Sequence, residues 1–169
     1  MTDLRRLISE AKKLNNESGV TILNSNKLIP IRIIMQSVLN FFSKAFYSLE
    51  VKGAENIPDK QVIFIANHQS MLDTQAIFRA LPFKNRLKLH VVGARDTFFE
   101  GWKSLFGFFA RISYNAFSFS RDKKIKQSLK DFGKIINSGG DILIYPEGTR
   151  SKTGRMSNFK YGIGLLSWH

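Results

Sequence analysis

Short apolar runs alternate with helix-like stretches from about residue 49 onward, and this alternation constrains the fold more than any other feature of the sequence. The runs predicted as strands are 49–53, 61–66, 87–93, 116–120 and 142–146. Apolar residues at helical spacing predict helices between them, at 70–81, 98–112 and 123–137. Strands that alternate with helices form parallel sheets covered by those helices. We therefore expect an α/β domain with a largely parallel sheet flanked by helices.

The first 48 residues have a different pattern, and we expect them to form an amphipathic N-terminal helical segment. One helix is predicted at 4–14, and a second begins near Pro30, a residue favoured in the first turn. Apolar residues such as Ile34, Val38 and Phe42 share one side of the second helix, and polar residues share the other. Two structures fit this pattern: a helix packed on the core, or one lying in a membrane interface.

The charge composition limits the classes of partner that we expect this protein to bind. Lys and Arg number 26 against 13 Asp and Glu, so the formal net charge is +13. Such a balance implies anionic partners, namely nucleic acid, anionic lipid, a phosphorylated substrate or an acidic protein. Nucleic acid is not expected, because RNA-recognition, zinc-finger and helix-turn-helix signatures are absent from the sequence. The absence of cysteine excludes disulfides and thiolate chemistry.

Polar side chains follow three of the predicted strands. His68 comes after 61–66, Arg121 after 116–120, and Glu147 after 142–146. Sites in parallel sheets lie beyond the carboxyl ends of the strands. We therefore expect these residues to converge at one edge of the sheet.

The stretch NHQSMLD, residues 67–73, has two interpretations that the sequence leaves open. Ser70 and Asp73 fit a capping box, which alone explains both residues. The chain before such a cap can also fold His68 over the first helical turn, where the Asp73 carboxylate would accept from one ring nitrogen. The other nitrogen would then be a base. Ser70 is a possible nucleophile, but capping is the favoured role.

The stretch YPEGTRS, residues 145–151, is either an ordinary turn after a strand or a loop that binds phosphate. Gly148 would let the backbone approach a ligand, Thr149 would donate from its hydroxyl, and Arg150 would bind phosphate in a bidentate manner. Glu147 would accept hydrogen bonds from a polyol. Arg121 is a second candidate phosphate ligand, or an exposed strand-end charge.

These stretches resemble the motifs of the lysophospholipid/glycerol-phosphate acyltransferases, the 1-acylglycerol-3-phosphate acyltransferase (PlsC-like) superfamily. NHQSMLD is similar to the family's NHx4D motif, YPEGTRS to its (F/Y)PEGTRS motif, and Phe159 to Gly162 to the FKxG that follows. Between them, NAFSFSR resembles GxxFxxR, although Asn115 stands where that motif usually has Gly. The resemblance covers about residues 49–166.

The resemblance implies an enzyme that moves a fatty acyl group from acyl-CoA or acyl-carrier protein to the free hydroxyl of a lysophospholipid. The favoured acceptor is 1-acylglycerol-3-phosphate, which gives phosphatidate. His68 would be the general base, oriented by Asp73. No metal or cofactor is expected. The residues implied to bind the glycerol phosphate are Arg121, Glu147, Gly148, Thr149 and Arg150.

The resemblance also implies a peripheral or monotopic protein on the cytoplasmic face of a membrane, with the anionic lipid surface as a partner. We expect residues 1–48 to lie at that interface and residues 49–169 to form the acyltransferase domain. Family members continue to a further strand with a proline-containing motif, so this domain is expected to be incomplete at its C-terminus. Two alternatives remain: a catalytically inactive basic module that binds membrane or nucleic acid, and a hydrolase in which His68 and Asp73 activate water.

Overall fold

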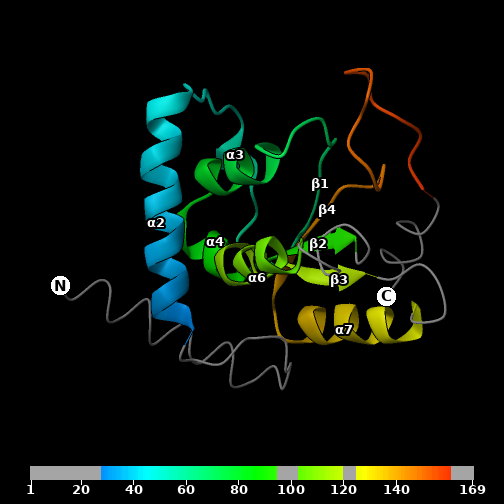
Figure 1. Ribbon diagram of the computed structural model, residues 1–169. Coiled ribbons are helices and arrows are strands. Elements are labelled where there is room, and N and C mark those ends of the chain that lie inside the picture. Colours follow the sequence, from blue (N-terminus) through cyan, green and yellow to red (C-terminus); the bar gives the residue numbers. More distant parts are fainter. Residues whose placement is uncertain (1–27, 95–102, 120–124, 161–169) are drawn as a thin grey trace.

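The computed structural model describes residues 28–94, 103–119 and 125–160, which form a parallel sheet with helices on both faces (Figure 1). The four described strands run in the order β1-β4-β2-β3, and every neighbouring pair is parallel. The predicted α/β class is therefore confirmed. The elements in chain order are α2 (Ile29–Phe46), η1 (Ala54–Asn56), β1 (Ile63–Ile65), α3 (Asp73–Ala80), α4 (Phe83–Lys88), β2 (Leu89–Ala94), α6 (Lys103–Tyr114), β3 (Phe117–Phe119), α7 (Ile125–Asn137) and β4 (Asp141–Ile144).

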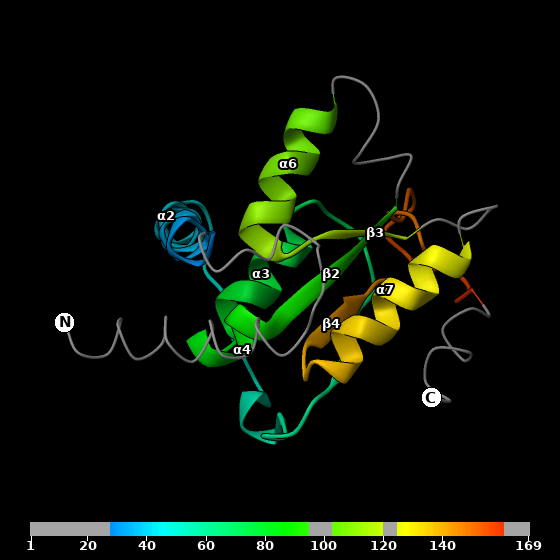
Figure 2. The same ribbon diagram turned by 90° about the horizontal axis from the view of Figure 1, so that it is seen from below.

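Strand β4 lies inside the sheet, and its apolar residues alternate between the two faces. Ile142 and Ile144 pack with Phe132 of α7, whereas Leu143 packs with Phe78 of α3 on the other side. Figure 2 shows α7 on one side of the sheet and α3, α4 and α6 on the other. A parallel sheet covered on both faces needs apolar residues at consecutive positions, which is why its strands have continuous apolar runs.

A buried carboxylate joins the strands at the amino-terminal edge of the sheet. Oδ1 of Asp141 accepts the backbone N–H of Val62 at 3.1 Å, and Oδ2 lies 3.1 Å from Nζ of Lys88. The side chain of Asp141 is fully buried, and a charge removed from water is tolerated only when it is paired and hydrogen-bonded. Asp141 therefore fixes the starts of β1, β4 and β2 relative to one another, at the edge opposite the predicted site.

Helix α2 turns several polar side chains inward and most of its apolar side chains outward. Buried Arg32 donates from Nε to the carbonyl of Ile112 at 2.9 Å, and buried Gln36 donates to the carbonyl of Ser113 at 2.6 Å. These carbonyls belong to the last turn of α6, where helical hydrogen bonding leaves acceptors without partners.

The outward residues of α2 are strongly exposed: Ile34 to 63%, Phe41 to 72% and Phe46 to 83%. The core-packing interpretation of this helix holds for Ile29 and Ile33, which are buried against Phe83 and Leu87. Among the helices within the described ranges, none has the length and apolar character needed to cross a membrane.

Three predictions about elements differ from the structure. Residues 49–53 form no strand; Gly53, with φ of 80°, instead turns the chain into η1. The helix predicted from residue 70 becomes regular only at Asp73. Helix α4 was missed because Pro82 ends the preceding helical pattern, but the same proline stands at the N-cap of α4. Proline is well tolerated where a helix begins, so it can end one helix and precede another.

Candidate active site

Strands β1 and β4 are parallel neighbours, so the segments after their carboxyl ends lie together. Residues 67–73 follow β1, and the loop 145–160 follows β4. The backbone of His68 is bonded to this loop on both sides: its N–H donates to Oε1 of Glu147 at 2.7 Å, and its carbonyl accepts the N–H of Ser151 at 2.7 Å. The predicted convergence of His68 and Glu147 is confirmed.

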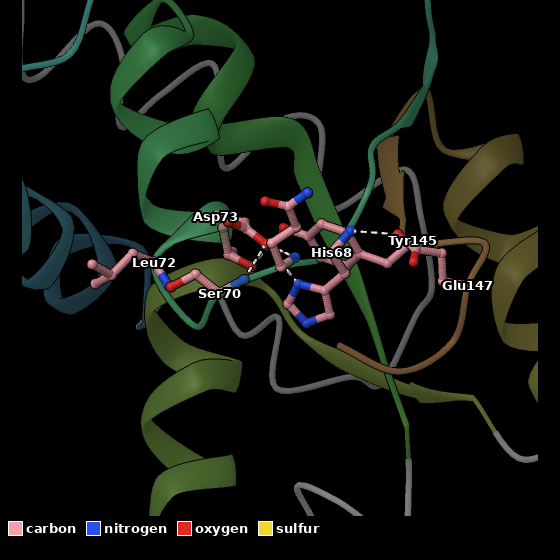
Figure 3. Close-up of polar contacts among 8 residues, drawn as sticks. His68, Ser70, Leu72, Asp73, Tyr145 and Glu147 are labelled. Carbon is pink, nitrogen blue, oxygen red and sulfur yellow. Dashed lines mark hydrogen bonds and ion pairs between the residues drawn. The ribbon is translucent and has the colours of Figure 1, made fainter. Parts of the chain in front are cut away.

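The side chains of His68 and Asp73 are in direct contact (Figure 3). Nδ1 of His68 lies 2.9 Å from Oδ2 of Asp73, and the His68 side chain is largely buried. Within the part of the chain that the structure describes, no hydrogen bond engages Nε2 of His68. The carboxylate therefore selects the tautomer with the proton on Nδ1, which leaves Nε2 with a free lone pair.

The hydrogen bonds expected of the capping box are present beside this contact, but they lie in the turn before α3, whose N-cap is Leu72. Oδ2 of Asp73 accepts the backbone N–H groups of Gln69 at 2.7 Å and Ser70 at 2.8 Å, while the Ser70 hydroxyl accepts the N–H of Leu72 at 3.1 Å. The two interpretations of NHQSMLD are thus compatible, because one carboxylate closes the helix start and also contacts the ring. The Ser70 hydroxyl is used in the turn, as the capping role requires.

Hydrogen bonds keep Asp73 ionised. Partial burial alone would raise the pKa of this carboxyl, but the Ser70 amide, the His68 ring and the Gln69 amide outweigh burial and hold the pKa below its usual value. An ionised Asp73 can stabilise an imidazolium at His68.

Glu147 lies beneath the loop and supports its backbone. The residue is 2% exposed, and its second oxygen, Oε2, accepts the N–H of Ser157 at 2.8 Å. The amides of Ser157 and His68 hold the pKa of this carboxyl below its usual value. The predicted hydrogen bond from Glu147 to a polyol stays a prediction, and it would have to be made by a side chain that already holds two backbone amides.

The next three residues form the outer part of the loop. The N–H of Gly148 donates to the carbonyl of Tyr145 at 2.9 Å, and its φ of 72° is the left-handed conformation that favours glycine. Thr149 and Arg150 follow, and both are exposed. They lie near His68, because the next residue, Ser151, donates its N–H to the His68 carbonyl. Their predicted role in phosphate binding is thus compatible with their position. Arg121 lies outside the described residues.

Sequence reasoning missed Tyr145 and Thr74. The Tyr145 ring stacks on the His68 imidazole with centroids 4.1 Å apart and an angle of 18° between planes, and the Tyr145 hydroxyl lies 2.8 Å from Oγ1 of Thr74. The available signal was the aromatic residue that opens the YPEGTRS stretch. No group of three His, Cys, Asp or Glu side chains able to hold a metal ion occurs in residues 28–94, 103–119 and 125–160.

Comparison with known proteins gives consistent matches. A family model described as Acyltransferase matches residues 48–167. The chain is similar to a 1-acyl-sn-glycerol-3-phosphate acyltransferase of Chlamydomonas reinhardtii, with 33% identity over 123 residues that make up 69% of this chain and 34% of that protein. It is also similar to a 1-acyl-sn-glycerol-3-phosphate acyltransferase of Pseudomonas aeruginosa, with 32% identity over 122 residues, 70% of this chain and 44% of that protein.

A solved structure has a similar fold. It is the crystal structure of the 1-acyl-sn-glycerophosphate (LPA) acyltransferase PlsC from Thermotoga maritima, with a TM-score of 0.59 and 22% identity. The match covers 80% of this chain and 54% of that one. The matched region spans about a third of the length of several curated relatives, 34%, 32% and 34%.

Proposed function

The chain belongs to the acyltransferase family whose model matches residues 48–167, and from this we propose that it transfers an acyl group from a thioester to the free hydroxyl of a lysophospholipid. Its relatives are named 1-acyl-sn-glycerol-3-phosphate acyltransferases, which favours 1-acylglycerol-3-phosphate as the acceptor and phosphatidate as the product. The proposed donor is acyl-CoA or acyl-carrier protein. Either donor enters as a substrate.

The contact between Nδ1 of His68 and Oδ2 of Asp73 is the observation on which this proposal depends. Nε2 takes the proton of the acceptor hydroxyl while the hydroxyl oxygen attacks the thioester carbonyl carbon. The carbon–sulfur bond then breaks, and the departing thiolate takes the proton from the imidazolium. The acceptor becomes an ester, the donor becomes a free thiol, and His68 returns to its neutral form.

The rate enhancement that these groups can supply is adequate for this mechanism. A positioned general base is typically worth ~10²–10⁴ in rate. A thioester is already an activated acyl donor, so holding the two substrates in line supplies much of the remainder. Asp73 contributes by fixing the tautomer of His68 and by stabilising the imidazolium.

The acceptor phosphate is proposed to bind beside His68. Gly148, Thr149 and Arg150 supply a backbone bend, a hydroxyl and a guanidinium on the exposed part of the loop. Arg121 is proposed as a second phosphate ligand. Glu147 supports this site from below through the backbone of His68 and Ser157, in addition to any contact with the acceptor.

The protein is proposed to lie on the cytoplasmic face of a membrane, as a peripheral or monotopic protein. Two observations support this placement: the exposed apolar face of α2 and the net charge of +13, which favours anionic lipid. The same two observations favour the second candidate function, a membrane-binding module without catalysis.

An acyl-transfer assay with both donors and a panel of lysophospholipid acceptors tests the proposal. We expect phosphatidate formation by the wild type, and a fall of ~10²–10⁴ in kcat for His68→Ala. Asp73→Asn should also lower kcat, and Arg150→Ala should raise KM for acceptors that carry a phosphate. Met71→Ala is a matched control, because Met71 is exposed in the same segment and its side chain is outside the proposed mechanism.

Two results would contradict this proposal. One is the absence of acyl transfer by the wild type with every donor and acceptor, combined with binding to anionic vesicles, which would favour the membrane-binding module. The other is full activity in His68→Ala, which would show that His68 is not the general base.

A further inference from the structure

We propose that Tyr145 is a positioning residue for catalysis, which acts by holding the face of the His68 ring; this rests on the proposed function of His68. The two rings are stacked, with their centroids 4.1 Å apart and their planes at 18°. Tyr145 directly follows β4, whereas His68 follows β1. The stack therefore joins the two segments that form the site.

Tyr145 is itself held firmly. Its hydroxyl is bonded to Oγ1 of Thr74, the residue after Asp73 on α3, at 2.8 Å. Its ring packs against the core cluster that includes Phe78 and Leu143. Burial raises the pKa of the Tyr145 hydroxyl above its usual value, so the group stays neutral and keeps its bond to Thr74. A ring fixed at its hydroxyl and against the core is a rigid surface for the imidazole.

The stack supplies a restraint that Asp73 does not. The bond between Nδ1 and Oδ2 holds one edge of the imidazole at 2.9 Å, but a single hydrogen bond tolerates a tilt of the ring. A flat ring against the imidazole face opposes this tilt, because stacked aromatic rings keep their planes nearly parallel. The backbone bonds of His68 to Glu147 and Ser151 set where the residue lies, and Tyr145 sets the plane in which Nε2 points.

The aromatic face also matches the charge that forms during the reaction. His68 becomes an imidazolium when it takes the hydroxyl proton. A cation within ~6 Å of a tyrosine centroid is attracted by the negative face of the ring. This attraction grows as the proton is transferred, so it favours the transition state over the bound substrates and affects kcat more than KM.

Variants at Tyr145 separate positioning from a general structural role. Tyr145→Phe and Thr74→Val both keep an aromatic ring at position 145 and lose its hydrogen bond to Thr74. Tyr145→Leu removes the ring. We expect Tyr145→Phe and Thr74→Val to keep most of the activity. Tyr145→Leu should lower kcat by about 10-fold to 100-fold with KM for both substrates unchanged. Tyr114→Leu is the matched control, a partly buried tyrosine bonded to Gln75 instead of Thr74.

NMR of the histidine ring protons gives a readout that does not depend on activity. The chain has 3 histidines, and His68→Ala identifies the signals of His68. The ring current of Tyr145 should shift these signals upfield in the wild type and in Tyr145→Phe, and the shift should vanish in Tyr145→Leu.

The proposal is overturned if the His68 signals are the same in Tyr145→Leu as in the wild type, or if that variant keeps the wild-type kcat. It is also overturned if Tyr145→Phe is as impaired as Tyr145→Leu, since the ring would then not be the essential group. If the wild type transfers no acyl group, the proposed function fails, and the His68 signals alone decide whether Tyr145 holds the ring.

Discussion

Asn115 explains a departure from the family pattern at the level of a single residue. Its φ is 52°, in the left-handed region that glycine adopts most easily and that asparagine tolerates better than most residues. Its side chain is buried and donates from Nδ2 to the carbonyls of Leu87 at 3.3 Å and Leu89 at 3.2 Å. Asparagine thus takes a conformation that glycine also adopts readily, and it adds hydrogen bonds to the end of α4 and the start of β2.

We expect Asn115→Ala to lower the free energy of unfolding by about 1–3 kcal/mol, because alanine is strained at this φ and leaves both carbonyls without the side-chain donor. Asn115→Gly should cost less, since only the hydrogen bonds are lost. Urea unfolding followed by circular dichroism measures both. Equal losses in the two variants would show that the backbone conformation contributes nothing.

Individual contacts in the site were predictable where the residues are close in sequence, whereas for distant residues the sequence predicted only that they lie at the same edge of the sheet. His68 and Asp73 are 5 positions apart, and the capping box that joins their segments has a sequence signature. The bond from His68 to Glu147 spans 79 positions and depends on the alignment of β1 with β4. Sequence placed Glu147 at the site, but only the packing of these strands shows that its oxygens hold backbone amides and that Tyr145 covers the ring.

At the level of elements, helical periodicity predicts that a helix has two faces but does not say which faces inward. In α2 much of the polar face is inside: Arg32, Gln36 and Ser43 are buried, and Gln75 of α3 donates to the side chain of Asn40. In α7 the apolar residue Leu129 is exposed, while the polar residue Ser128 is buried. The sheet and its neighbours were predictable from alternation, but the rotation of each helix is set by the partners it meets.

The exposed face of α2 should bind lipid. We expect the double variant Phe41→Ser/Phe46→Ser to reduce partition onto anionic vesicles by about tenfold or more, because each phenyl ring loses the gain from burial in the interface. Thermal stability should stay close to the wild type, since both side chains are exposed in the folded protein. Vesicle co-sedimentation provides the measurement. Met156→Ser is the control, another exposed apolar residue that lies far from α2 in sequence; an equal reduction there would contradict a specific role for α2.

At the level of the whole molecule, His90 makes the stability of the fold depend on pH. It is buried in β2, and its Nδ1 donates to the carbonyl of Lys88 at 2.9 Å. Burial, with a smaller contribution from Arg32, lowers the pKa of His90 from 6.5 to about 4. Between these two pKa values His90 is protonated in the unfolded chain and neutral in the folded chain. The stability of the fold therefore falls as the pH falls from about 6.5 to about 4. The pKa values of Asp73 and Glu147 are also lowered in the folded protein, so protonation of these carboxylates lowers stability further at a pH below the usual pKa of a carboxyl group.

We expect the free energy of unfolding of the wild type to drop by about 3 kcal/mol through His90 alone as the pH falls from 7 to 4. His90→Leu removes the titrating group, so its unfolding free energy should vary less across this interval even if the variant is less stable at pH 7. Urea unfolding at several pH values gives the comparison. The same pH dependence in both proteins would assign the acid sensitivity to other groups.

The strand order has a consequence for how the protein is made. β1 is the first of the described strands to leave the ribosome, yet it pairs within the described sheet only with β4, the last of them to be synthesised. Until residues 141–144 emerge, β1 lacks its neighbour in the described sheet, and His68 has neither Glu147 nor Tyr145 beside it. Pairings so distant in sequence form late, because the intervening chain must be closed first. The β2–β3 pair can assemble before β4 emerges, but the proposed catalytic centre forms only once β4 and the loop that follows it have been synthesised.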